Sequence, residues 1–163
     1  MMNIEDEQTL NDQLKRELVR IKILIDEDGK TPEHKAELFF EQALLYGEAQ
    51  QYAEAIASYD KALEFKPDDH EAWYNRGYAL GKLGRWEQAI ASYDKALEFK
   101  PDDTSAFYNK ACCYALNGQV DSSIQNLQRV IALNPHKYRK MAKTDSDFDK
   151  VRSHPQFQAL IQE

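Results

Sequence analysis

The string AIASYDKALEFKPDD occurs twice in this chain, at residues 55–69 and again at residues 89–103, an offset of 34 residues. A weaker third copy follows at the same offset, because residues 125–135 occupy the places that residues 57–67 and 91–101 hold earlier. A fixed period of this length is the signature of stacked supersecondary units. The repeat therefore specifies the architecture, and it favours a protein that displays a surface over one that performs chemistry.

Three units of 34 residues result, 36–69, 70–103 and 104–137. Each unit contains two apolar patterns at the 3–4 spacing of one helical face, which predicts two helices per unit. In the second unit Gly84 breaks the pattern between the helices and Pro101 ends the second helix.

The same kinds of side chain return in every unit. Small residues recur at Ala43, Gly77 and Ala111 and at Ala55, Ala89 and Ser123, and large ones recur at Phe39, Trp73 and Phe107 and at Tyr59, Tyr93 and Leu127. We expect the small residues to let the two helices of a unit approach closely and the large ones to fill the space between units.

The pattern W-x-x-x-G-x-x-L, then A-x-x-x-Y-x-x-A, then P, in a 34-residue frame, resembles the tetratricopeptide repeat over residues 36–137, in a style similar to repeat proteins common in cyanobacteria. The resemblance implies an all-α fold, in which antiparallel helix pairs stack into a right-handed superhelix, an α-solenoid. It also implies an adaptor without enzymatic activity that binds a partner protein or peptide in a concave groove. Because one helix pair cannot bury its apolar face alone, the array needs a cap at each end.

Residues 1–35 form an N-terminal region in which residues 4–27 are expected to be an amphipathic helix. Its apolar stripe is Leu10, Leu14, Leu18, Ile21 and Ile25. Thr31 and Pro32 have the pattern of an N-cap followed by a first helical proline. Three roles remain open for this helix: a cap on the first unit, a homodimer seam, or a lid lying in the groove.

Residues 138–163 are expected to form capping helices at the other end. Tyr138 begins a fourth unit in register, but the pattern fails at Thr144. Ser146 is the predicted cap of a short helix through Val151, and Pro155 is expected to open another.

Composition excludes several classes of protein. No apolar run approaches the ~18 residues of a membrane span, and the acidic start lacks the basic and apolar regions of a secretory signal. Cys112 and Cys113 are neighbours, which does not suit a mutual disulfide, so a reducing cytoplasm is expected. The net charge of −7 disfavours nucleic acid as a partner.

No pattern predicts a metal site, a cofactor site or a catalytic site. Asp145, Asp147 and Asp149 alternate like the start of a calcium loop, but Lys150 and Gln156 stand where such a loop needs Gly and Glu. No nucleophile is paired with a base, and no glycine-rich phosphate loop occurs. Cys112 is expected to be an exposed thiol and Cys113 to be packed.

In the resembled family the first helix of each unit lines the concave side, at positions two, five, six, nine and thirteen. These positions hold Glu37, Phe40, Glu41, Leu44 and Glu48 in the first unit, Glu71, Tyr74, Asn75, Tyr78 and Lys82 in the second, and Ser105, Tyr108, Asn109, Cys112 and Leu116 in the third. All of them except Glu71, Ser105 and Leu116 make up the predicted peptide-binding site. Phe40, Tyr74 and Tyr108 form an aromatic row, which supplies contact area at low entropic cost.

One subclass of the family clamps a C-terminal carboxylate with Lys and Asn in the first repeat, Asn in the second, and Lys and Arg in the third. The matching positions here hold Phe40, Leu44, Asn75, Ser105 and Asn109, so only Asn75 agrees. The acidic residues of the first unit would also repel an acidic tail, which favours a neutral or basic partner. The alternative function is a self-assembling structural protein that dimerises through its N-terminal helix.

Overall fold

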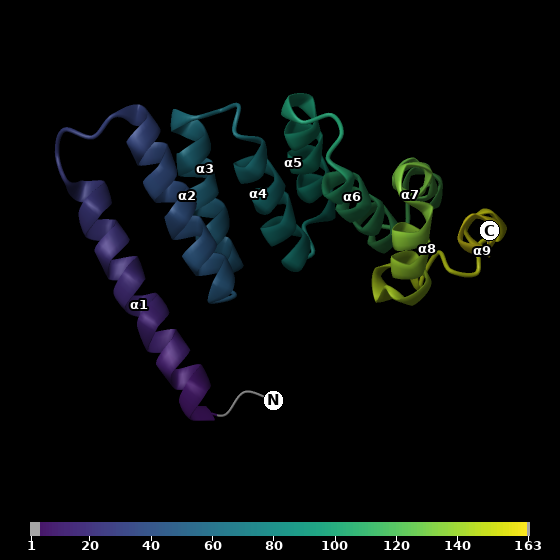
Figure 1. Cartoon of the computed structure of the whole chain (residues 1–163), viewed down its shortest axis with the longest axis horizontal. Helices are drawn as coiled ribbons and strands as arrows, with labels where there is room; N and C mark the ends of the chain where they lie inside the picture. Colours follow the sequence, from purple (N-terminus) through teal and green to yellow (C-terminus); the bar gives the residue numbers. More distant parts are fainter. Residues whose placement is uncertain (1–3, 163) are drawn as a thin grey trace.

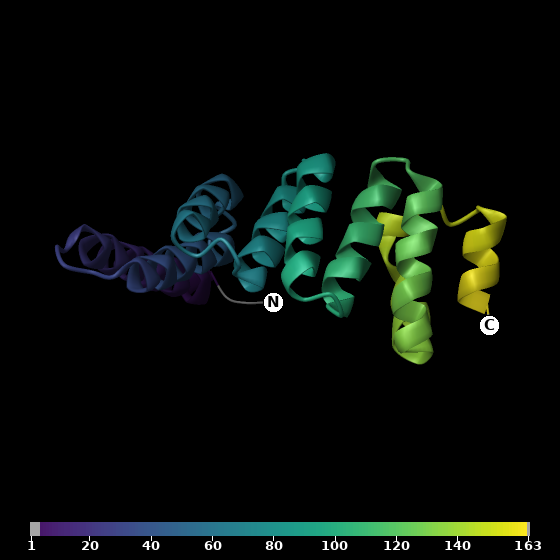
Figure 2. The same cartoon turned by 90° about the horizontal axis from the view of Figure 1, so that it is seen from above.

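The computed structural model describes residues 4–162, and the side chains from Asn11 onward; it shows α-helices stacked in a row (Figures 1 and 2). The order is α1 (Ile4–Asp26), α2 (Pro32–Glu48), α3 (Tyr52–Phe65), α4 (His70–Lys82), α5 (Trp86–Phe99), α6 (Thr104–Leu116), α7 (Val120–Leu133), α8 (Pro135–Thr144), the 3-10 turn η1 (Ser146–Phe148) and α9 (Pro155–Gln162). The predicted α-solenoid of helix pairs, α2 with α3, α4 with α5 and α6 with α7, is confirmed. None of the described helices has both the length and the apolar content that crossing a membrane requires.

Polar caps begin the first helix of each unit. The Thr31 hydroxyl accepts from the backbone N–H of His34, and Pro32 is the first helical residue, as predicted. Asp69 and Asp103 do the same for α4 and α6, each accepting two backbone N–H groups. These bonds satisfy donors that a helix start would otherwise leave without a partner.

The turn inside each unit uses a left-handed backbone conformation at one fixed position. Gly84 has φ +70° and Gly118 has φ +76°. Gln50 holds the same place in the first unit with φ +57°, although glycine is the residue that adopts this conformation without steric cost.

Close helix packing explains the small residues of the repeat. Ala43, Ala55, Ala89 and Ala111 are all fully buried. At Gly77 even a Cβ atom would lie 2.9 Å from Cε1 of Tyr93, which is closer than packed carbon atoms approach. The predicted role of the small positions is therefore confirmed.

Ion pairs join each unit to the next at equivalent positions. Arg76 of α4 donates to Asp60 of α3 at 2.6 Å and also to the Ser92 hydroxyl of α5 at 2.7 Å. Lys110 of α6 donates to Asp94 of α5, which is the same pair one unit later. The repeated offset fixes the register between neighbouring pairs.

Helix α1 packs against α2 at the end of the row, and Figure 1 shows it extending past the end of α2. Leu14, Leu18 and Ile21 are buried there, and Ile25 is partly buried. The Leu10 side chain, also expected in this stripe, lies outside the described side chains. The helix therefore caps the first unit and does not lie over α4 and α6 as a lid.

The C-terminal end differs from the prediction at two points. Helix α8 begins at Pro135, three residues before the expected Tyr138, because a first helical proline needs no N–H partner. Asp145, not Ser146, caps the following segment by accepting the N–H of Asp147, and η1 ends at Phe148 rather than extending to Val151.

Aromatic packing holds this C-terminal segment against the third unit. Phe148 and Phe157 are fully buried with ring centroids 5.5 Å apart, and Phe148 also packs on Tyr108 of α6. The Arg152 guanidinium donates to the backbone carbonyls of Ala142, Lys143 and Asp145, so it ties the turn after η1 to the end of α8.

Candidate functional site

Helices α2, α4 and α6 carry the residues predicted to face the groove. Glu37, Glu41, Leu44, Glu48, Tyr78 and Lys82 are exposed, Phe40, Tyr74, Asn75 and Asn109 are partly buried, and Tyr108 and Cys112 are buried. Two of the exposed side chains are large and apolar, Leu44 at 39% and Tyr78 at 45% exposure. The exposed part of the predicted site therefore belongs to the first and second units.

A hollow of about 250 Å³, here called the first hollow, lies between α2, α3 and α4. Its lining includes Leu44, Glu48, Tyr52, Tyr59, Asn75 and Tyr78. The aromatic rings and Leu44 offer apolar contact, while the Asn75 amide can both donate and accept hydrogen bonds. This combination suits a peptide whose backbone is extended and whose side chains are partly apolar.

A second hollow of about 280 Å³, also bordered by Tyr78, lies between α4, α5, α6 and η1. Its lining includes Tyr78, Lys82, Trp86, Asn109, Cys112 and Asp147. Because Tyr78 borders both hollows, the two adjoin along the row of first helices.

A third hollow, of about 340 Å³, lies where α2 meets α4 and is bordered by Glu37, Phe40 and Glu71. All of the predicted site residues except Glu41, Tyr74 and Tyr108 border one of these three hollows. Each hollow opens beside the first helices of the units.

The third residue of the predicted aromatic row, Tyr108, is buried, whereas Phe40 and Tyr74 are only partly buried. The rings of Phe40 and Tyr74 pack on Tyr59 and Tyr93, with centroids 5.8 and 5.7 Å apart. Tyr108 is instead covered by the C-terminal segment, packs on Tyr138 and is only 4% exposed. It therefore belongs to the core of the C-terminal cap and offers no surface to a partner.

Asn109, predicted to contact a peptide, already makes a hydrogen bond within the protein. Nδ2 of Asn109 donates to the Tyr74 hydroxyl at 2.9 Å. That bond uses one of the two N–H donors of the amide and does not involve its carbonyl oxygen. Asn109 therefore offers the second hollow an acceptor and one further donor.

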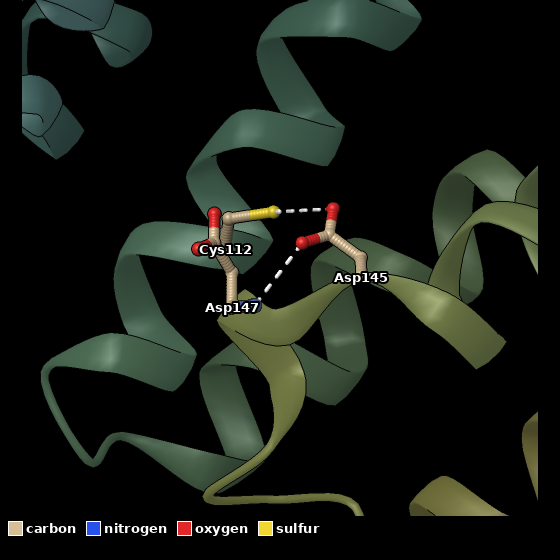
Figure 3. A group of neighbouring side chains, drawn as sticks. All are labelled: Cys112, Asp145 and Asp147. Carbon is tan, nitrogen blue, oxygen red and sulfur yellow. Dashed lines mark hydrogen bonds between the residues drawn. The ribbon is translucent and has the colours of Figure 1, made fainter.

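Cys112 is not the exposed thiol that the sequence predicted, because η1 covers it and leaves it 6% exposed. Its Sγ lies 3.9 Å from Oδ2 of Asp145 (Figure 3). The same oxygen accepts a 2.9 Å hydrogen bond from the Tyr108 hydroxyl. Burial, with a smaller effect of the nearby carboxylates, raises the pKa of Cys112 far above that of a free thiol. The thiol is therefore protonated and unreactive at neutral pH.

Asp147 is a groove residue that sequence reasoning missed. It lies outside the repeats, yet η1 brings it into the wall of the second hollow. Burial and the neighbouring Asp145 raise the pKa of the Asp147 carboxyl, and Lys82 opposes them. The signal in the sequence is the alternation of aspartates, which is similar to the start of a calcium loop but lacks the Gly and Glu of one.

The Sγ of Cys112 and one oxygen each from Asp145 and Asp147 all lie within 4.8 Å of one another. Such a donor set could hold a divalent cation, but binding would have to release the proton of the buried thiol. Sequence analysis predicted no metal site, and this grouping arises only because η1 folds onto α6.

Comparison with known proteins identifies the repeat. The family profile described as Tetratricopeptide repeat matches residues 40–104 and, overlapping them, residues 76–138. Comparison with curated protein sequences gave no significant match.

Solved structures share the fold at low sequence identity. A crystal structure of MamA is 18% identical with a TM-score of 0.72, over 99% of this chain and 94% of that one. YrrB, described as a TPR protein with an unusual peptide-binding site, is 20% identical with a TM-score of 0.70, over 83% and 68%. The first TPR of Spaghetti (RPAP3), bound to the HSP90 peptide SRMEEVD, is 21% identical with a TM-score of 0.61, over 68% and 93%.

The structural likeness agrees with the 34-residue period and the stacked helix pairs. Together the two profile matches span residues 40–138, which is more than half of the sequence. The chain therefore belongs to the tetratricopeptide repeat family.

Proposed function

We propose that this chain is a protein-interaction adaptor, without enzymatic activity, that docks a segment of a partner protein along α2, α4 and α6. The observation that carries the proposal is the position of Tyr78, which is 45% exposed and borders two adjoining hollows. An exposed aromatic ring between two concave surfaces is the kind of anchor on which binding energy concentrates.

Related folds support this function. YrrB has a described peptide-binding site, and the Spaghetti repeat domain is bound to a peptide in its solved structure. Peptide binding by those two proteins supports the same use for the repeats here. Asn75 is the one residue here that matches the carboxylate clamp, so we do not expect the ligand to be a C-terminal carboxylate.

Charge indicates the kind of partner. Glu37, Glu41 and Glu48 are exposed on α2, and Asp147 adds a carboxylate at the second hollow. Complementary charge steers encounter and disfavours wrong partners. The favoured ligand is therefore a neutral to basic segment with some apolar side chains.

A displayed library of random peptides, selected on the full chain, tests the proposal. The double variant Leu44→Ser with Tyr78→Ala removes the two exposed apolar contacts of the groove. We expect it to weaken binding of the selected peptides by about tenfold or more. Leu133→Ser is the matched control, because it removes a more exposed leucine at the end of α7, away from the hollows.

Fluorescence polarisation with labelled peptides gives the three affinities. Equal affinity for the wild type, the double variant and the control would mean that peptides bind elsewhere. A library that yields no specific peptide would contradict the adaptor function itself.

A second function, self-association through α1, is favoured by one observation. Val19 and Ile23 are each 59% exposed and lie one helical turn apart on α1. We infer that a second copy could cover them, as the dimer alternative requires. Sedimentation velocity of the wild type and of a Val19→Gln, Ile23→Gln variant distinguishes the cases: a dimer that the variant loses supports self-association, and a wild-type monomer at micromolar concentration contradicts it.

A further inference from the structure

The second hollow combines an aromatic wall with groups that accept hydrogen bonds. Tyr78 of α4, Asn109 of α6 and Asp147 of η1 all line it. These come from three elements, two of them first helices of repeats and one from the C-terminal segment. The inference below rests on the proposed function and names the ligand chemistry of this part of the groove.

Negative charge gathers at the η1 end of the hollow. Asp145 and Asp147 have carboxylate oxygens within 4.8 Å of each other (Figure 3). The Asp145 carboxylate is already used, since it accepts from the Tyr108 hydroxyl and from the N–H of Asp147. Asp147 is the carboxylate that lines the hollow, and a cation beside it would offset the repulsion between the two.

Lys82 shows that a cation fits beside this aromatic wall. Its Nζ lies 5.1 Å from the centroid of the Tyr78 ring, and the side chain is exposed. Charge on Lys82 already favours the ionised form of Asp147. An exposed lysine can turn to solvent at little cost, so a better-fitting cation from a partner can replace it.

The hydrogen-bonding groups of the second hollow favour one kind of ligand side chain. The Asp147 carboxylate and the Asn109 carbonyl oxygen are both acceptors, and one N–H of the Asn109 amide already donates to Tyr74. A guest with several donors therefore matches these two groups. A guanidinium has five donors on a planar group that also stacks on aromatic rings, which an ammonium cannot do.

We propose that the second hollow receives a basic side chain of the docked segment, arginine in preference to lysine. The methylene stem lies along Tyr78, and the guanidinium donates to Asp147 and to the Asn109 carbonyl oxygen. The C-terminal segment thereby gives the groove a specificity-determining residue that the repeats do not contain.

A thermodynamic cycle on the selected peptides tests this pairing in buffer containing EDTA, so that no divalent metal ion occupies the carboxylates. We expect arginine to be enriched at one peptide position. Replacing that arginine by citrulline, which is neutral and of nearly the same shape, should weaken binding to the wild type about tenfold. On Asp147→Asn the same replacement should change affinity less than about twofold, because the charge it pairs with is gone.

Asp102→Asn is the matched control, since Asp102 is an exposed aspartate in the turn before α6, and it should keep the full citrulline effect. An equal citrulline effect in the wild type and in Asp147→Asn would overturn the proposal. So would selected peptides without enrichment of basic residues. Both results would leave the adaptor function standing, whereas failure to select any peptide would remove both.

Lys82→Gln gives a second readout that does not depend on the folding of η1. Removing the lysine beside the Tyr78 ring should tighten binding of the arginine peptide about threefold relative to the citrulline peptide. Unchanged or weaker binding of the arginine peptide would contradict the proposal.

Discussion

The ring of Tyr93 fills the space beside Gly77 so completely that a Cβ atom on residue 77 would lie 2.9 Å from it. Tyr93 is buried on α5 and Gly77 is buried on α4. The contact shows how one position of the repeat controls the distance between two paired helices. It also gives the first prediction.

Gly77→Ala should destabilise the protein, because overpacking costs about 1–3 kcal/mol and exceeds the ~1 kcal/mol that alanine gains in a helix. Gly81→Ala on the same helix should be neutral or stabilising, since the nearest atom to its Cβ would be Cys113 Sγ at 3.8 Å. Urea unfolding measures both. If Tyr93 is the obstacle, the cost of Gly77→Ala should disappear in a Tyr93→Leu background, and a cost that persists there would assign the strain elsewhere.

Gln50 offers a stabilising substitution. It holds the turn position that Gly84 and Gly118 fill in the other units, with a positive φ that costs a side chain about 1 kcal/mol. Gln50→Gly should therefore raise the free energy of unfolding by roughly 0.5–1 kcal/mol, and Gly84→Gln should lower it by a similar amount. Thermal unfolding of the two variants checks the pair; opposite signs from those stated would contradict the turn assignment.

Asp147 should make stability depend on pH. Burial and Asp145 raise its pKa in the folded chain, with Lys82 opposing, so the folded state holds the proton more tightly than the unfolded state. Its ionised form therefore costs stability above the folded pKa, and the cost disappears as the pH falls below the unfolded value of about 3.9. Asp147→Asn should be more stable than the wild type at pH 7, and the difference should shrink towards pH 4.

Urea unfolding at both pH values measures that difference, with Asp102→Asn as the exposed control. A difference that stays constant with pH would mean that the Asp147 charge carries no such cost.

Both cysteines should be unreactive in the folded protein. Cys112 and Cys113 are buried, and burial raises the pKa of Cys113 to about 12. We expect a thiol reagent such as DTNB to label neither in native buffer and to label both in denaturant. Rapid labelling of Cys112 in native buffer would show that η1 does not cover α6 as described.

The fold of the repeats could be predicted from the sequence because each repeat packs against another unit with the same pattern. Residues 34 places apart occupy equivalent positions, so the close approach of the paired helices at small residues such as Gly77 could be expected from the repeat. The caps at Thr31, Asp69 and Asp103 involve residues only two or three places apart, which also makes them visible in the sequence.

The burial of residues in the third unit was harder to predict, because this unit packs against the C-terminal segment and not against another repeat. Phe148 comes from η1, which has no counterpart earlier in the chain, and nothing in the spacing indicates that it covers Tyr108. Burial of Cys112 and entry of Asp147 into the groove have the same cause. The sequence therefore indicated the exposed residues on the first helices of the first two units and missed the part of the second hollow built by the C-terminal segment.

The central claim is that a partner docks on the first helices around Tyr78. Chemical-shift mapping of the isotope-labelled full chain with a library-selected peptide tests it most directly. The account predicts that the largest amide shifts cluster at Leu44, Asn75, Tyr78 and Asn109, beside the adjoining hollows. Shifts that cluster instead around the exposed side chains of Phe65, Phe99 and Leu133, at the ends of the second helices, would contradict it.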